Sequence, residues 1–336
     1  SKLGLMSSSD YIDVEKELFS QGYYDSYLTD NTNYPAVSPV VEILNKQKAG
    51  LLTTDEANRL MNSFRSVNLT DQYGKYMYRK RAYQQYNVNL QGGSNKMTYF
   101  FSAGYDQDMS SLSADNDRIT IRSNNTYTPL RSLEFSANIQ LTKDNISTGK
   151  PDYGVLRVGR WSIPYISLAD KSGNPLPVAR NYSQLYIDTA GGRKLLDWNY
   201  YPLTDWQHDK TNTVQTDVLA SFGIKAHPLS GVTANVLYQY ERQNGDARTL
   251  QDPESYGARN LINLFTQIAP SGEITYILPQ GGILSAYNTT VESQSVRGQL
   301  GVDKTLGKHV INAIAGGELR QVHSFTNGNS FYGYDD

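Results

Sequence analysis

The stretch YNVNLQGGSNKMTYFFSAGY, residues 86–105, decides the fold class because polar and apolar side chains alternate on both sides of a turn. A β-strand places successive side chains on opposite faces, so this alternation predicts two strands. Gly92 and Gly93 accept the backbone angles of a tight reversal, and Ser94 and Asn95 are good turn formers. The stretch therefore predicts a β-hairpin. One face would carry Tyr86, Val88, Leu90, Met97, Tyr99, Phe101, Ala103 and Tyr105.

Composition excludes several classes of function. The chain has 336 residues and a formal net charge of −2, from 31 basic and 33 acidic side chains, so nothing indicates nucleic-acid binding. It has no cysteine, which excludes disulfides, thiolate metal sites and a cysteine nucleophile. Tyrosine is the unusual residue, with 26 against 3 Trp and 9 Phe. Tyrosine suits strands and surfaces that are apolar on one side and wet on the other.

The hydropathy pattern predicts no transmembrane helix, because no run of about 18 apolar residues occurs. The start, SKLGLMSSSD, lacks the pattern of a signal peptide and an initiator Met, so we expect a fragment or a processed piece. A mean hydropathy of −0.54 is still compatible with a transmembrane barrel, in which half of each strand faces a wet lumen.

Residues 1–81 contain the helical signals. Ser7 to Asp10 precede YIDVEKELF, in which Tyr11, Val14 and Leu18 fall at helical spacing. Thr53 and Glu56 form a capping box that predicts a helix to about Phe64, and NTNYPAVSP between the two helices is expected to be loop. We interpret these segments as surface connections.

Further strands are expected after residue 117. Period-two alternation places them at about 118–127, 133–142, 213–226, 232–241, 296–303 and 310–320. Short turns, GGSNK, TPLRS, HPLSG and TLGK, would alternate with long connections at 1–81, 107–117, 143–210 and 243–288.

This organisation favours a transmembrane β-barrel. The strands approach the roughly 9–11 residues that cross a bilayer, and such barrels have short periplasmic turns and long extracellular loops. The polar faces would line a lumen and the apolar faces would meet lipid. We expect one curved antiparallel sheet in sequence order with open edges, part of a larger barrel. Aromatic girdles would contain Tyr86, Tyr99, Tyr105, Tyr127, Tyr238 and Tyr240. The alternative is a soluble β-sandwich with its apolar faces packed together.

No catalytic constellation is found, so the chain is predicted not to be an enzyme and to need no cofactor. Asp205, His208 and Asp209 could present metal ligands, but their spacing does not bring them together, and no metal site is predicted. The run from Asp170 to Asn174 lacks the closing Glu of a calcium loop and is expected to be a β-turn.

Aromatic side chains of the long loops are the best candidates for contact with a substrate or partner, because their faces stack on sugar rings and on peptide side chains. The alternative is that they only pack the loops. The candidates are Trp161, Trp198, Tyr200, Tyr201, Trp206, Tyr256, Arg259 and Tyr276.

Several motifs resemble the SusC/RagA family of TonB-linked outer-membrane proteins. The run L-x-GGS-x-K-x-x-Y-x-x-S-x-x-Y, Leu90 to Tyr105, looks like the first hairpin of that family. Four further runs also resemble sequence runs of that family. They are DYIDVEKELF, the D-x-x-G-N-P run at Asp170, the Y-x-x-R-N-L-I-N run at Tyr256 and the Y-x-x-P-x-G-G run at Tyr276. Each motif is weak alone, and their order and spacing carry the resemblance.

The resemblance implies the early portion of a 22-stranded barrel in the Gram-negative outer membrane, of the type found in Bacteroidetes. Residues 1–81 would form an extracellular segment with short helices, and residues 82–336 an incomplete barrel of about eight strands without plug or C-terminal strands. The complete protein would import oligosaccharides or peptides, powered through the TonB complex, with a SusD-like lipoprotein as partner. The rival hypothesis is a secreted β-sandwich adhesin or carbohydrate-binding module.

Overall fold

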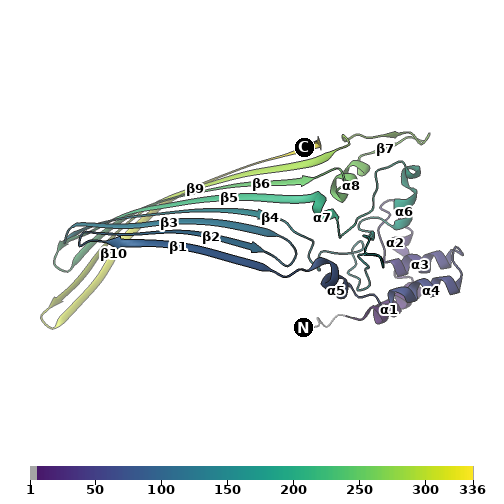
Figure 1. Ribbon diagram of the computed structural model, residues 1–336, viewed down its shortest axis with the longest axis horizontal. Coiled ribbons are helices and arrows are strands. Elements are labelled where there is room, and N and C mark those ends of the chain that lie inside the picture. The colour runs from purple at the N-terminus through teal and green to yellow at the C-terminus, as the bar shows by residue number, and fades with distance from the viewer. Residues whose placement is uncertain (1–5, 336) are drawn as a thin grey trace.

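The computed structural model describes residues 6–335 and divides into a long sheet and a helical head at one end of it (Figure 1). The first five residues of the expected 1–81 segment, and Asp336 at the end of the expected barrel segment, lie outside the described residues. We use "head" for residues 6–81, 148–208 and 252–281. Within residues 6–335, no helix is both long and apolar enough to cross a membrane.

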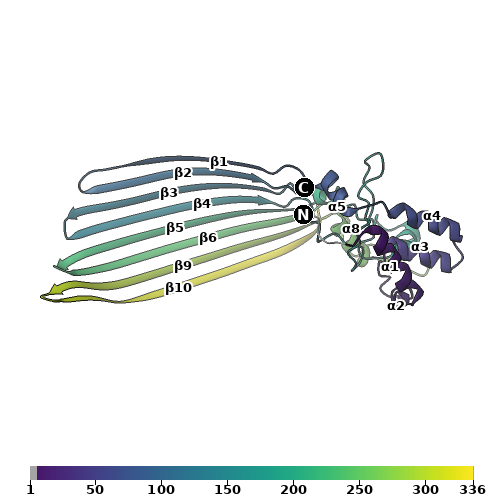
Figure 2. The ribbon, with the colours of Figure 1, turned by 90° about the horizontal axis from the view of Figure 1, so that it is seen from below.

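The sheet is a single antiparallel meander of eight strands in the order β1-β2-β3-β4-β5-β6-β9-β10 (Figure 2). This confirms the expected sheet in sequence order, and the barrel is not closed. The strands are β1 (Ala82–Gly93), β2 (Met97–Met109), β3 (Asp115–Leu130), β4 (Leu133–Ser147), β5 (Asp209–Leu229), β6 (Val232–Gln251), β9 (Gly282–Leu306) and β10 (His309–Tyr334). A separate pair, β7 (Gln267–Ile268) and β8 (Ile274–Thr275), lies in the head. The second large sheet that a sandwich requires is not found in the described chain.

The strand register sorts side chains onto two unlike faces, because directly paired residues lie on the same side of a sheet. One row across the sheet reads Gly92, Tyr99, Asn125, Ala137, Phe222, Tyr238, Val296 and Leu319. We call this side the apolar face. The adjacent row on the polar face reads Gln91, Phe100, Asn124, Asn138, Ser221, Gln239, Ser295 and Arg320. Phe100 is the apolar exception in this row.

The connections confirm that the long loops share one end, with three corrections to their bounds. The tight turns between paired strands lie opposite the head, where Gly231 and Gly307 adopt positive φ angles of 78° and 60°. The connection expected at 107–117 is wrong, since β2 and β3 extend until only residues 110–114 join them. The connection expected at 143–210 is too long, because β4 continues to Ser147 and β5 begins at Asp209. The connection expected at 243–288 is also too long, because β6 continues to Gln251 and β9 begins at Gly282.

The head contains short helices. They are α1 (Ser8–Ser20), α2 (Asp25–Leu28), α3 (Pro39–Lys48), α4 (Thr54–Phe64), α5 (Leu69–Gln72), the π-helix η1 (Tyr73–Met77), α6 (Gln184–Thr189), the 3-10 helix η2 (Ala190–Arg193), α7 (Asp205–His208) and α8 (Tyr256–Leu264). Side chains cap the starts of α1, α3, α4, α5, α6 and α8. The capping box is confirmed, with Thr53 accepting from Glu56 N and Glu56 accepting from Thr53 N. Helices α3 and α8 were not expected. The turn at Asp170 is confirmed, with its carboxylate accepting from the Ser172 and Asn174 backbones.

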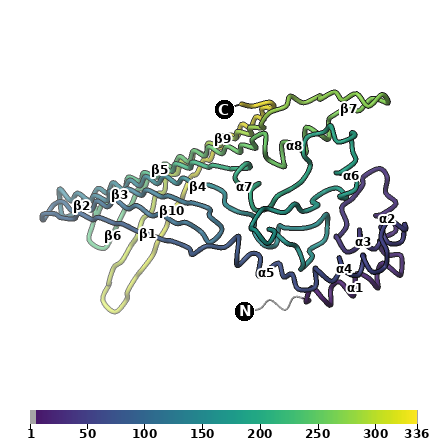
Figure 3. Tube along the Cα trace, turned by 45° about the vertical axis from the view of Figure 1, so that its right-hand side comes forward, coloured from purple at the N-terminus to yellow at the C-terminus, as the bar shows by residue number. Residues whose placement is uncertain are grey.

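The hydrophobic core lies in the head and is built from segments far apart in sequence. Ile12, Val40 and Met61 of the N-terminal helices pack in one cluster with Tyr165 and Leu168. Figure 3 shows the purple N-terminal helices facing teal segments from the middle of the chain. The head is therefore one packed unit in which residues 6–81 depend on the two later connections.

Candidate functional site

Three of the candidate aromatic residues lie inside the head core. Trp198, Tyr200 and Tyr256 are each about 5–6% exposed. The Tyr200 and Tyr256 rings meet edge to face with centroids 5.4 Å apart, and burial raises the pKa of each phenol to about 12. Trp198 packs on Tyr182 and donates from Nε1 to Asn260 Oδ1 at 2.9 Å. These groups fix the two long connections to each other.

Arg259 links α8 to the connection between β4 and β5, residues 148–208. Its guanidinium donates to Asp197 O at 2.6 Å and to Asn199 O at 3.2 Å, and it pairs with the Asp197 carboxylate at 2.9 Å. Arg259 and Tyr201 also line a polar pocket of about 360 Å³ with Asp205 and His208. Asp205 accepts from Tyr256 N at 2.5 Å, and burial raises the pKa of its carboxyl above the usual range.

The remaining candidates are spread over the head. Trp161 lies against Tyr23, Tyr24 and Tyr27, with ring centroids 5.6–6.1 Å apart. Trp206 donates to Leu203 O at 2.9 Å, and the Tyr276 hydroxyl donates to Lys194 O at 3.0 Å. The eight candidates thus form one cluster around α8 and three separate contacts. Their contact with a substrate or partner stays a prediction.

One acidic side chain of the N-terminal helices, that of Glu15, is buried. Glu15 of α1 is 3% exposed and accepts a hydrogen bond from the Tyr165 hydroxyl. Burial raises the pKa of Glu15 to about 7, against the lowering effect of hydrogen bonds from Tyr165 and Ser38. Burial likewise raises the pKa of the Tyr165 phenol, and the charge of Glu15 adds to this. The pair ties α1 to the middle connection.

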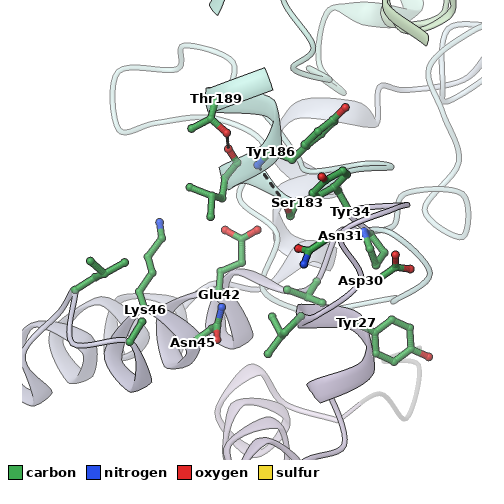
Figure 4. A pocket seen from close by; sticks show the side chains of 16 residues that line it. Tyr27, Asp30, Asn31, Tyr34, Glu42, Asn45, Lys46, Ser183, Tyr186 and Thr189 are labelled. Atoms are coloured by element: carbon green, nitrogen blue, oxygen red, sulfur yellow. Dashed lines mark hydrogen bonds between the residues drawn. The ribbon is translucent and has the colours of Figure 1, made fainter. Parts of the chain in front are cut away.

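A second pocket, the α3–α6 pocket, has a volume of about 340 Å³ (Figure 4). Glu42 and Lys46 of α3 face it one helical turn apart. Glu42 accepts from Gln184 N at 2.9 Å, and burial raises the pKa of its carboxyl. Tyr34 and Tyr186 stack at its side with centroids 4.1 Å apart. Its lining is mostly apolar, so it can accept a small apolar group.

Sequence reasoning missed the pocket residues of the N-terminal segment. Tyr27, Tyr34, Glu42 and Lys46 belong to a region interpreted as simple connections. The signal that could have found them is the density of tyrosine between residues 23 and 34, which exceeds what a solvated loop needs.

Metal binding receives no support from side-chain grouping. In residues 6–335, no group of three or more His, Cys, Asp or Glu side chains could hold a metal ion. The residues considered from the sequence are engaged elsewhere, since His208 Nδ1 lies 2.8 Å from Asp252 Oδ2 and Asp205 accepts from Tyr256 N.

Comparison with known proteins gives a result only at the level of structure. No protein-family model and no curated protein matches the chain. Among solved structures, the RagAB peptide transporter matches with a TM-score of 0.59 at 14% identity, over 90% of this chain. The fold is similar to part of a RagAB transporter chain.

Two further structures of the RagAB peptide importer give the same result. Its closed-closed and open-open states each match with a TM-score of 0.60 at 14% identity, over 91% and 90% of this chain. The chain spans about a third of the RagAB chains, since 34% of each is covered. At this identity the similarity to RagAB establishes the fold, which matches part of a barrel-type transporter.

Proposed function

We propose that this chain is part of an outer-membrane transporter, with the sheet crossing the membrane and the head on the outer surface. The observation that carries the proposal is the outline of the apolar face. Toward the head, the unbroken run of apolar or small side chains on this face ends at Tyr86 on β1, at Tyr240 on β6 and at Leu319 on β10, where Gln84, Arg242 and Gln321 follow. On β10, Phe325 lies beyond Gln321 and His323 on the same face.

These three end points do not lie in one row of paired residues across the sheet. Through the register, Tyr86 is level with Phe325 on β10, so the unbroken apolar run of β10 ends six residues lower, at Leu319 (325 − 319 = 6). The tight turns are displaced from strand to strand in the same direction. Thr98, beside the first turn, is level with Glu318, nine residues above the last turn at His309 (318 − 309 = 9). The apolar band is therefore oblique to the strands.

The slope of this band agrees with membrane barrels. Seven steps between eight strands span roughly 34 Å, and six to nine residues span roughly 20–30 Å along a strand. The strands would thus lie at about 30–40° to the band normal, close to the roughly 35–45° tilt of transmembrane barrels. The band on β10, from His309 to Leu319, has about the 9–11 residues that cross a bilayer.

Aromatic side chains support the same placement. On the apolar face, Tyr86 and Tyr105 stack with centroids 6.5 Å apart near the head-side border. Tyr99 and Tyr127 lie near the opposite border and are 39% and 49% exposed. Tyrosine is enriched at membrane interfaces, where its ring meets lipid and its hydroxyl meets water.

The proposal extends to the complete protein. By resemblance to the SusC/RagA family, it would import oligosaccharides or peptides with energy from the TonB complex and with a SusD-like surface lipoprotein. The match to a peptide transporter favours peptides over glycans. The head, as the part outside the lipid, would contact substrate and lipoprotein. No residue is assigned a catalytic role.

The test is labelling in intact cells with a membrane-impermeant maleimide, using the full-length protein in a cysteine-free background. Phe222→Cys, in the middle of the apolar face, should stay unlabelled because lipid covers it. Lys171→Cys, in the exposed turn of the head, should react rapidly. Rapid labelling of both positions would contradict the membrane placement and leave a secreted binding protein as the better explanation.

A further inference from the structure

A cleft of about 650 Å³ in the head is lined by two arginines. We call it the arginine cleft. Its walls come from residues 27–36, from Gly159 and Arg160, and from residues 180–182, and Leu264 at the end of α8 closes one side. Arg160 and Arg180 both face it, with Tyr27, Tyr182 and Asn181. None of these residues was singled out by the sequence.

The backbone of the cleft is held by bonds between distant segments. Ala36 N donates to Asn181 O at 3.1 Å, and Gly159 N donates to Ala179 O at 3.2 Å. Gly159 has a φ of 54°, and a Cβ there would lie 2.5 Å from Ala36 O. Only glycine fits this close approach. The two arginines are therefore carried by a fixed frame.

The arginine side chains are held by aromatic rings. The Arg180 guanidinium lies 4.6 Å from the Tyr200 ring centroid and 5.5 Å from that of Tyr256. Arg160 donates from Nη1 to the Tyr27 hydroxyl at 2.7 Å and lies 5.4 Å from the Trp161 ring centroid. Stacking of this kind orients a guanidinium while leaving its edge free to donate.

Neither arginine has an acidic partner among the described residues. The ion pairs within residues 6–335 include neither Arg160 nor Arg180. Asp205 is near enough for Arg180 to lower its pKa slightly, but its carboxylate is engaged by Tyr256 N. Each guanidinium has five N–H donors in a planar fork that fits a carboxylate with two parallel bonds. The cleft thus presents unneutralised, oriented positive charge.

We propose that the arginine cleft binds a carboxylate group of the transported ligand. Arg160 and Arg180 supply paired donors, the Asn181 side chain adds hydrogen bonding, and the Tyr27 and Tyr182 rings contact the adjoining part of the ligand. This deepens the proposed function, because it names a ligand chemistry for the outer head. Two sources carry that chemistry, an oligopeptide with acidic side chains and an oligosaccharide of uronic acids.

The experiment measures binding to the full-length protein purified in detergent. One pair of probes is a hexapeptide containing Asp and Glu and its Asn/Gln counterpart with an amidated C-terminus. The other pair is trigalacturonate and its methyl ester. The wild type should bind the acidic member of at least one pair about tenfold or more tightly than the neutral member, since charged hydrogen bonds discriminate by that much. The pair that shows the preference identifies the source.

Variants then assign the preference to the cleft. The double variant Arg160→Gln/Arg180→Gln should lose the preference for the acidic probe. Arg157→Gln removes the same charge from an exposed residue of the same connection outside the cleft and should keep it. Arg160→Lys/Arg180→Lys should keep part of it, because charge remains while the planar fork is lost. Unchanged hydrogen exchange of the head in each variant shows that it is folded.

Two outcomes overturn the inference. One is equal binding of acidic and neutral probes by the wild type, and the other is a preference that survives Arg160→Gln/Arg180→Gln. Both can occur in a protein that passes the maleimide test, so failure here leaves the proposed membrane placement intact. Failure of the maleimide test would instead contradict the transporter without deciding what the cleft binds.

Discussion

The sheet and the head use apolar side chains in opposite ways. Among the buried hydrophobic side chains of the described residues, only Ile283 belongs to the sheet, and the others lie in the head. The sheet instead exposes Val88, Phe222 and Leu319, which are 72%, 48% and 81% exposed. The head has a buried apolar core, whereas the sheet exposes a continuous apolar face, which marks a surface of interaction. Under the proposed placement, lipid would cover this face and water would surround the head.

The largest effect is expected from a cavity in the head. Met61, on α4, is 2% exposed, and Met61→Ala should cost about 2–5 kcal/mol of head stability through lost burial and an unfilled cavity. Leu60→Ala, one residue away and 38% exposed, should cost much less. Hydrogen exchange of the full-length protein in detergent would report both. Equal effects of the two variants would mean that the head has no core of the kind described.

A charge on the apolar face tests the sheet in the same manner. Phe222→Arg should destabilise the membrane-inserted protein by about 2–4 kcal/mol, because arginine is costly at mid-bilayer. Ser221→Arg, the next residue on the polar face, should cost little. Urea unfolding from liposomes measures both. A larger cost for Ser221→Arg would reverse the assignment of the two faces.

The buried acid predicts pH dependence confined to the head. The folded-state pKa of Glu15, about 7, exceeds the ordinary value of 4.5, so between these values the unfolded chain binds fewer protons than the folded one. Its contribution to stability is full below pH 4.5 and is lost as pH rises through 7. The loss is at most about 3 kcal/mol, from 2.5 pKa units at about 1.36 kcal/mol each.

Glu15→Gln should therefore flatten the dependence of head stability on pH and stabilise the head at pH 8. The difference from the wild type isolates Glu15, since Glu42 and Asp205, whose pKa values burial also raises, are present in both. The measurement is thermal unfolding at pH 5 and at pH 8, with the unfolding of the head monitored by hydrogen exchange. Parallel pH profiles for the two proteins would refute this account of Glu15.

The smallest effect concerns local helix formation. Thr53→Ala removes the N-cap of α4 and should cost about 1 kcal/mol of head stability. Thr53→Ser keeps the side-chain oxygen and should cost less. Amide exchange at residues 54–57 should rise in the first variant only, while exchange in the sheet stays unchanged. A rise in both variants would show that the methyl group rather than the cap matters.

The sequence was informative where one face of a strand is apolar and the other is polar. There the alternation is strict, as from Leu133 to Leu141 of β4, and the strand could be predicted. Farther along β6, both faces are polar, because Arg242, Asn244, Asp246 and Arg248 stand where apolar residues stood before. Under the proposed placement this part of β6 lies outside the membrane, where neither face needs to be apolar. The alternation therefore vanishes while the strand continues, and the pattern predicts a loop there.

The head could be predicted only in its local signals. The N-cap of α4 at Thr53 could be predicted from the sequence. Ser38 followed by Pro39 at the start of α3 is an equally local signal of a helix start. Most contact partners of Arg160, Arg180 and Glu15 lie more than 15 residues away in the sequence. The residues adjoining each of these three therefore do not indicate what it contacts. Aromatic richness located the cluster around α8 but could not say which rings are buried.

The hydrogen bond between Tyr165 and Glu15, 150 residues apart, sets an order of events during biogenesis. Helices α1, α3 and α4 precede residues 156–168 in the chain, and their apolar sides pack against those residues in one cluster. Contacts of such long range close slowly, because a long loop must be ordered before they form. Ile12 and Val40 are therefore fully covered only once this later segment has joined the cluster.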